Sequence, residues 1–101
     1  MAYQVIWLPK AIKTFEANID YLEKNWSEKE IIKFVLLVDK KLNNISNHPH
    51  LGSSRNKKNP NIRFTLIGKR VALIYQLKPN KKEIVLLLFW NTSQNPNQLK
   101  K

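Results

Sequence analysis

The chain has no cysteine, and its 101 residues include only two glycines and seven acidic residues. The absence of cysteine excludes disulfide bridges, cysteine-ligated zinc and thiol catalysis, and it fits a reducing cytoplasm. No apolar run approaches the roughly 20 residues that a membrane-spanning helix needs, and the amino terminus shows no signal-peptide pattern. We therefore expect a cytoplasmic protein without a membrane segment, folded as one domain over residues 1–101.

The positive charge is concentrated in the second half of the chain. Residues 55–101 contain 11 basic residues and 1 acidic residue, which gives 11 − 1 = +10, whereas residues 1–54 give 7 − 6 = +1. The two halves add up to the formal net charge of +11. Charge on one side of a protein favours a polyanionic partner or an acidic protein partner.

A strand followed by a helix is predicted at the start of the chain. Residues 3–8 are rich in strand formers, and their odd-numbered members share one face. Pro9 ends the strand and suits the first turn of a helix. Apolar residues then recur at helical spacing, which places them on one stripe and predicts that the last of them, a tryptophan, lies in the core: Ile12, Phe15, Ile19, Leu22 and Trp26.

A second helix is predicted from Ser27 to about Ser46. Ser27 and Glu30 have the spacing of a capping box, in which two side chains satisfy free amides at a helix start. The apolar stripe of this helix is wider than one neighbour needs, so we expect it to pack against both the first helix and a sheet. The stripe and its extension comprise Ile31, Ile32, Phe34, Val35, Leu36, Leu37, Val38, Leu42 and Ile45.

The second half is predicted to be a loop, three strands and a tail. His48–Asn61 contains two prolines and a glycine and is predicted to be a surface loop. A two-residue turn at Gly68-Lys69 would join the next two strands. Residues 84–90 are apolar throughout, as in an interior strand covered on both faces, and residues 91–101 form a polar tail.

This turn fixes a predicted register for the hairpin. It pairs Ile67 with Arg70, Leu66 with Val71, Phe64 with Leu73 and Ile62 with Tyr75. The opposite face then carries Arg63, Thr65, Arg70 and Gln76. The order β-α-α-β-β-β predicts an α+β fold in which an N-terminal strand and a helical hairpin pack on a mostly antiparallel four-stranded sheet.

Four segments in this order resemble the RelE/ParE superfamily of type II toxins, also called plasmid-stabilisation toxins. They are residues 3–22, the loop His-Pro-His-Leu-Gly at 48–52, the hairpin at 62–77, and residues 88–96. The resemblance implies a small basic toxin that a cognate antitoxin keeps silent. One branch of the superfamily cuts messenger RNA in the ribosomal A site, and the other poisons DNA gyrase without such cleavage.

The ribonuclease branch needs a base for the 2′-hydroxyl, cations for the phosphate and an acid for the leaving oxygen. By resemblance, Arg63 and Arg70 would contact the phosphate, and His50 would supply the base. However, Ala72 and Ser93 stand where similar members carry arginine, and the tail after Tyr75 offers no histidine or tyrosine. The catalytic set is therefore incomplete, and two loop histidines without a third ligand do not predict a metal site. No cofactor is predicted.

Two interpretations of the basic residues stay open. They can form a binding surface for nucleic acid or for a protein target, or they can be solvated residues that keep a sheet face soluble. The residues concerned are Arg55, Lys57, Lys58, Arg63, Lys69 and Arg70. The gaps in the catalytic set favour a ParE-like, gyrase-directed and non-cleaving toxin. The alternative is a RelE-like, ribosome-dependent endonuclease. The excess apolar surface predicts a protein partner, which for this superfamily is the antitoxin.

Overall fold

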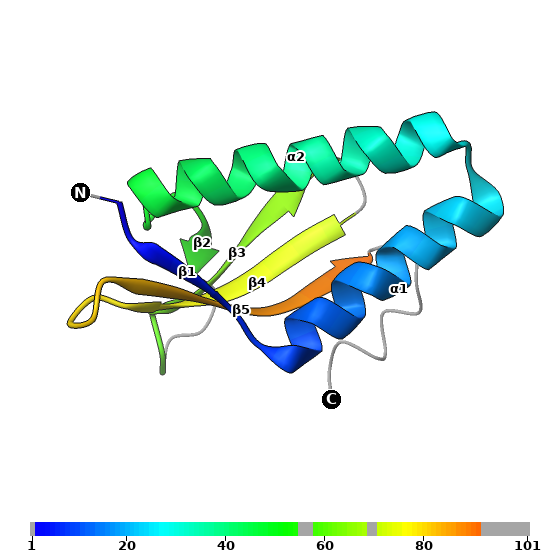
Figure 1. Cartoon of the computed structure of the whole chain (residues 1–101). Coiled ribbons are helices and arrows are strands. Elements are labelled where there is room, and N and C mark those ends of the chain that lie inside the picture. The colour runs from blue at the N-terminus through cyan, green and yellow to red at the C-terminus, as the bar shows by residue number, and fades with distance from the viewer. Residues whose placement is uncertain (1, 55–57, 69–70, 92–101) are drawn as a thin grey trace.

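The computed structural model describes residues 2–54, 58–68 and 71–91 of the chain. Two helices and five strands follow one another along these residues (Figure 1). The elements are β1 (Gln4–Trp7), α1 (Pro9–Asn25), α2 (Glu28–Asn47), β2 (Ser53–Ser54), β3 (Ile62–Ile67), β4 (Val71–Lys78) and β5 (Glu83–Asn91).

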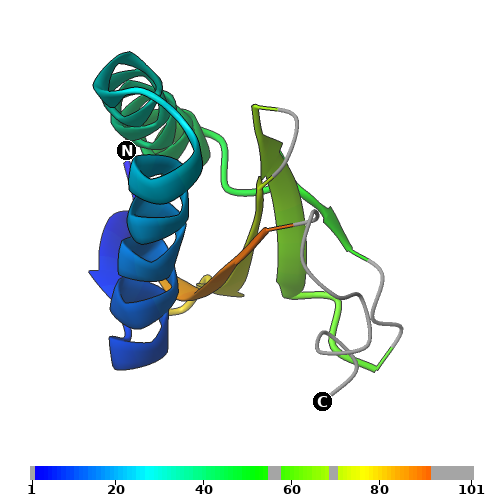
Figure 2. The same ribbon diagram turned by 90° about the vertical axis from the view of Figure 1, so that its right-hand side faces the viewer.

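The strands form one sheet in the order β1-β5-β4-β3-β2. The β1–β5 pair is parallel and the other three pairs are antiparallel. Both helices lie on the same face of the sheet, as the side view shows (Figure 2). The predicted α+β fold is confirmed, and the two-residue strand β2 adds a fifth strand within the predicted loop.

Helix α1 starts at Pro9, as predicted, and the middle of the predicted stripe packs against the core through Phe15, Ile19 and Leu22, whereas its two ends are exposed. Ala11 and Asn18 are its buried residues. Ile12 is 45% exposed and Trp26 is 43% exposed, so the prediction of a core Trp26 is wrong. Trp26 is the C-cap residue of α1, in an extended conformation, and therefore no longer follows the helical stripe.

Helix α2 buries only one face of its broad apolar surface. Phe34, Val38 and Ile45 are buried, whereas Ile32 and Leu36 are 55% and 64% exposed. Ser27 is the N-cap, but its side chain makes no capping hydrogen bond, so that bond of the predicted capping box is not formed. The helix packs inward, and the apolar side chains on its outer face stay largely exposed.

The β3–β4 hairpin differs from the predicted register by one residue. Ile67 pairs with Val71, so the pairing leaves three residues between the two strands in place of the predicted two. Gly68 has a φ of +66°, which lies in the left-handed region that glycine adopts without steric cost. This register buries Ile67 and Val71, whereas the predicted one paired Ile67 with a charged arginine.

The corrected register moves Arg63 to the other face of the sheet. Arg63 pairs with Tyr75, and Thr65 pairs with Leu73, while Gln76 pairs with Ile62. Side chains of directly paired residues project from the same face. Since Tyr75 and Leu73 belong to the core under the helices, Arg63 and Thr65 project there too. Arg63, Thr65 and Gln76 therefore do not share one face, as the two-residue turn had predicted.

Strand β5 is the interior strand that its apolar run predicted. Ile74 pairs with Leu88 and Tyr75 pairs with Leu86, which leaves Leu87 as a bulge. The bulge lets both Leu86 and Phe89 face the helices. Around Phe89 the aromatic rings of Trp7, Phe15, Phe34 and Phe89 pack with centroids between 5.5 and 5.8 Å apart.

Candidate functional site

The loop after α2 is fastened to the sheet by hydrogen bonds from two strands. The Gly52 amide donates to the Tyr75 hydroxyl oxygen at 2.8 Å, and the Tyr75 hydroxyl donates to the Pro49 carbonyl at 3.2 Å. Arg63 Nη1 donates to the Gly52 carbonyl at 2.6 Å. We call His48–Gly52, Arg63 and Tyr75 the loop site. The close contact of this loop with β3 and Tyr75 explains why residue 52 is a glycine.

Gly52 has no room for a side chain. A Cβ atom there would lie 2.5 Å from the Tyr75 hydroxyl and 2.6 Å from the Phe64 carbonyl oxygen. The carbonyl oxygen belongs to the backbone of β3 and cannot move aside cheaply. Glycine is therefore needed for the close approach of the loop to β3, and the loop's position depends on it.

The polar groups of the loop site are partly screened from water. Burial raises the pKa of the Tyr75 hydroxyl above its ordinary value of 10.0, against the opposing effects of the Gly52 hydrogen bond and the Arg63 charge. Arg63 Nε is buried and has no hydrogen-bond partner among the described residues. Among the described residues, the guanidinium thus donates to the Gly52 carbonyl, and its charge acts on the Tyr75 hydroxyl.

The structure brings together only some of the residues that the sequence singled out. His50 is exposed on the same loop whose Gly52 carbonyl accepts from Arg63. Lys58 is exposed, and Ala72 is half-buried opposite Leu66, on the face away from Arg63. The remaining predicted positions lie outside the described residues: Arg55, Lys57, Lys69, Arg70 and Ser93. Within residues 2–54, 58–68 and 71–91, no three acidic or histidine side chains are grouped as a metal site.

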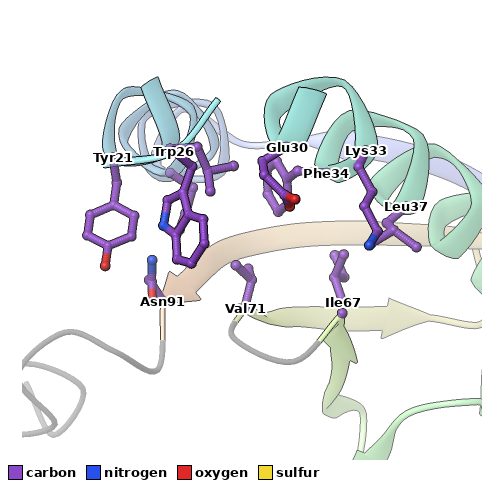
Figure 3. Close-up of a pocket in the computed structure, with 12 residues that line it drawn as sticks. Tyr21, Trp26, Glu30, Lys33, Phe34, Leu37, Ile67, Val71 and Asn91 are labelled. Carbon is purple, nitrogen blue, oxygen red and sulfur yellow. The ribbon is translucent and has the colours of Figure 1, made fainter. Parts of the chain in front are cut away.

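A cleft of about 410 Å³ opens at the opposite end of the space between the helices and the sheet. Its walls come from the second half of α1, the start of α2, the β3–β4 hairpin and the end of β5. Figure 3 shows side chains of the two helices reaching toward those of the sheet, with Trp26 above Asn91 and Leu37 above Ile67. The lining comprises Asn18, Tyr21, Leu22, Trp26, Glu30, Lys33, Phe34, Leu37, Ile67, Gly68, Val71 and Asn91.

One wall of the cleft is formed beyond the end of β1, where side chains of α1 bond to the exposed edge of β5. β1 pairs with β5 only as far as Leu86. Beyond it, the Phe89 amide donates to Thr14 Oγ1 at 2.9 Å, and Asn18 Nδ2 donates to the Phe89 carbonyl at 3.3 Å. Two side chains of α1 thus satisfy backbone groups that a longer β1 would have paired. Asn18 Oδ1 is buried and has no partner among the described residues.

Sequence reasoning missed Asn18 and the hydroxyl of Tyr75. Asn18 lies between Phe15 and Leu22 at spacings of three and four, so a polar residue on the core-facing side of a helix was its signal. Tyr75 was counted only as an apolar strand residue. Its polar tip needed a buried partner, which the nearby Pro-x-x-Gly loop provides.

Residues 5–96 match the family described as the ParE toxin of the type II toxin–antitoxin system parDE. The comparison with curated proteins gave no match. Among the helices of the described residues, none is long and apolar enough to cross a bilayer.

Solved structures with the same fold come from both branches of the superfamily. A chain of the chromosomal ParDE system from P. aeruginosa has a TM-score of 0.70 and 18% identity, with 89% of this chain and 96% of that chain covered. A chain of the RelBE2 toxin–antitoxin complex from Mycobacterium tuberculosis has a TM-score of 0.65 and 12% identity, with 90% and 99% covered. The isolated E. coli RelE toxin has a TM-score of 0.63 and 15% identity, with 98% and 94% covered. The TM-scores show that these chains share the fold of this protein.

Proposed function

Since this chain belongs to the ParE toxin family of type II toxin–antitoxin systems, we propose that it acts on DNA gyrase in the cytoplasm and cleaves no RNA. It is a toxin of the RelE/ParE superfamily, and relatives with the same fold were solved in toxin–antitoxin complexes. A cognate antitoxin is accordingly its regulatory partner. Gyrase as the target is the proposal.

The placement of Arg63 is the observation that best supports a non-cleaving toxin. Its side chain projects from the same face as Tyr75, under the helices, and Nη1 is 2.6 Å from the Gly52 carbonyl. A guanidinium that stabilises a scissile phosphate has to present its donors to that phosphate. Here one donor is used to hold the loop, and Ala72 leaves no second cation at its position on β4.

Under this proposal the basic half of the chain serves for docking. Residues 55–101 give +10 of the formal net charge of +11. Such a field attracts acidic protein surfaces and speeds their encounter with the toxin. The binding residues that we propose are those predicted from the sequence apart from Arg63, which holds the loop. They are Arg55, Lys57, Lys58, Lys69 and Arg70, of which Lys58 is exposed in the described part.

A RelE-like ribonuclease is the second candidate, and the loop site supports it in one respect. His50 lies on the loop whose Gly52 accepts from Arg63, so a base and a cation belong to one connected unit. In that function Arg63 and Arg70 would contact the scissile phosphate, and His50 would take the proton of the 2′-hydroxyl.

Purified protein in a gyrase supercoiling assay tests the gyrase proposal. We expect loss of supercoiling and DNA breaks that become visible after the gyrase is denatured. The matched control is the same assay with topoisomerase I in place of gyrase, which should be unaffected. Full supercoiling by gyrase at a molar excess of toxin would contradict the proposal.

A further inference from the structure

We propose that two copies of this chain associate through the outer face of α2. This inference goes beyond the proposed function and does not depend on the target of the toxin. The two copies of α2 lie antiparallel, and an apolar patch with a pair of opposite charges at each end forms the seam between them. Three observations carry the inference.

The first observation is an apolar patch on the solvent side of α2. Ile32, Val35 and Leu36 are 55%, 42% and 64% exposed, whereas the opposite side of the helix is buried in the core. Residues three and four positions apart are neighbours on one helical face. Both views place α2 at the margin of the molecule (Figure 1, Figure 2). Adjoining apolar side chains that stay exposed mark an interaction surface.

The second observation is the order of charges along this face. Lys29 precedes Ile32 by three positions, Asp39 follows Leu36 by three, and both charged residues are exposed. Positions 29, 32, 36 and 39 thus recur at intervals of three, four and three, the spacing of a seam between two paired helices. Along α2 this seam is basic, apolar, apolar and acidic.

This order is self-complementary only between antiparallel copies. A two-fold axis at residue 34 sets Ile32 against Leu36 of the other copy and Lys29 against Asp39 of the other copy, and it repeats both contacts. Glu28 and Lys40 adjoin the seam, so each of its ends gathers two acidic residues and two lysines. Parallel copies would instead oppose lysine to lysine and aspartate to aspartate, which disfavours association.

The third observation is that the helices carry little of the net charge. Together α1 and α2 contain seven basic and six acidic residues, which gives 7 − 6 = +1, whereas residues 55–101 give +10. A helix about 10 Å across separates the seam from the sheet, and charges more than about 8 Å apart are largely screened at physiological salt. Two copies therefore meet at α2 with little repulsion, and their basic halves stay on the outside for docking.

The same face disfavours a polyanion or an anionic membrane as its occupant. Asp39 lies in the seam and Glu28 lies beside it, so phosphate groups would face carboxylates. The contact between two copies over residues 28–40 is about 20 Å long, and we expect it to bury less than the standard interface of about 1,600 Å². The dimer should therefore have micromolar affinity or weaker.

Sedimentation equilibrium of the full-length chain tests the association. The protein is measured at physiological salt from low micromolar to millimolar concentration. We expect the wild type to pass from monomer to dimer over this range. A chain that stays monomeric at millimolar concentration would overturn the inference.

Two leucine variants locate the interface. Leu36→Asp should raise the dissociation constant of the dimer at least about 30-fold, because the residue occurs twice in a two-fold interface. Leu66→Asp is the matched control, since Leu66 is 50% exposed on β3 and receives the same charge. It should change the constant less than about threefold. Thermal unfolding confirms that each variant folds, and an equal or larger effect of Leu66→Asp would overturn the inference.

An exchange of charges tests the antiparallel alignment. Lys29→Asp places a carboxylate opposite Asp39 at both ends of the seam and should weaken the dimer about tenfold. The double variant K29D/D39K restores opposite charges and should return the dissociation constant to within about threefold of the wild type.

The control for this exchange is K29D/E23K. It restores the net charge through an exposed residue of α1, away from the seam, and should stay as weak as Lys29→Asp alone. Recovery with K29D/E23K would show that only the net charge matters and would overturn the alignment. Failure of K29D/D39K to recover would overturn it as well.

Discussion

The two ends of the space between the helices and the sheet differ in how they are closed. At the loop site, Tyr75 and Arg63 fasten Pro49 and Gly52 through three hydrogen bonds of 2.6 to 3.2 Å. At the cleft, mostly apolar side chains line a hollow with a volume of about 410 Å³. Hydrogen bonds close the end at the loop site, whereas the other end keeps a hollow with mostly apolar walls.

The difference indicates a structural role for the loop site and leaves apolar side chains accessible at the cleft. Residues that hold a loop by buried hydrogen bonds cannot be exchanged without leaving groups unpaired. Apolar walls around an open hollow remain available to a partner. The two glycines of the chain mark the two ends, since Gly52 belongs to the loop site and Gly68 lines the cleft.

The largest effect is expected from alanine at Gly52, with alanine at Gly68 as the comparison. Gly52→Ala brings a Cβ within 2.6 Å of the Phe64 carbonyl, which should lower the free energy of unfolding by about 3 kcal/mol. Gly68→Ala meets only the Leu37 side chain at 3.5 Å and keeps a φ of +66°, which should cost about 1 kcal/mol. Urea denaturation of both variants measures the difference. Equal losses would break the contrast between the two ends.

A smaller effect is expected from removing one hydroxyl at the loop site. Tyr75→Phe leaves the Gly52 amide and the Pro49 carbonyl without this partner, and we expect a loss of about 2 kcal/mol in the free energy of unfolding. Tyr21→Phe at the cleft is the matched control and should cost less than about 0.5 kcal/mol. A control that loses as much as Tyr75→Phe would contradict the structural role of the loop site.

The smallest effect is a pH dependence that belongs to Tyr75. Burial raises the pKa of its hydroxyl in the folded state above 10.0, so the folded protein holds this proton more tightly than the unfolded chain. Stability from this group is complete below the unfolded pKa and is lost as the pH rises through the folded pKa. Between about pH 9 and pH 11, the free energy of unfolding should fall more steeply for the wild type than for Tyr75→Phe. Identical slopes would show that the hydroxyl is solvated.

Much of the fold was predictable because its signals are local. Pro9 starts α1, and the apolar run of residues 84–90 forms the interior strand β5. The hairpin register was not predictable from alternation, because both registers alternate equally well and only the packing of Ile67 and Val71 in the core decides between them. That single shift moved Arg63 from a polar sheet face to the loop site.

The candidate site was less predictable because it depends on contacts between distant segments. The tip of Tyr75 meets a loop more than 20 residues away, and the cleft joins the ends of two helices to a hairpin. Helical periodicity placed Trp26 in the core, although it caps α1 and is exposed. The roles proposed for Arg55, Lys57, Lys69 and Arg70 stay predictions, since these residues lie outside the described part.

We predict that Arg63 holds the loop and takes no part in RNA cleavage. A translating extract tests this most directly. Wild-type protein, Arg63→Ala and Tyr75→Phe are added to the extract, and cleavage of the translated messenger RNA is mapped by primer extension. Tyr75→Phe is the matched control because it loosens the same loop without removing a cation. We predict no ribosome-dependent cuts with any of the three proteins. Cuts made by the wild type and by Tyr75→Phe but lost with Arg63→Ala would contradict the account.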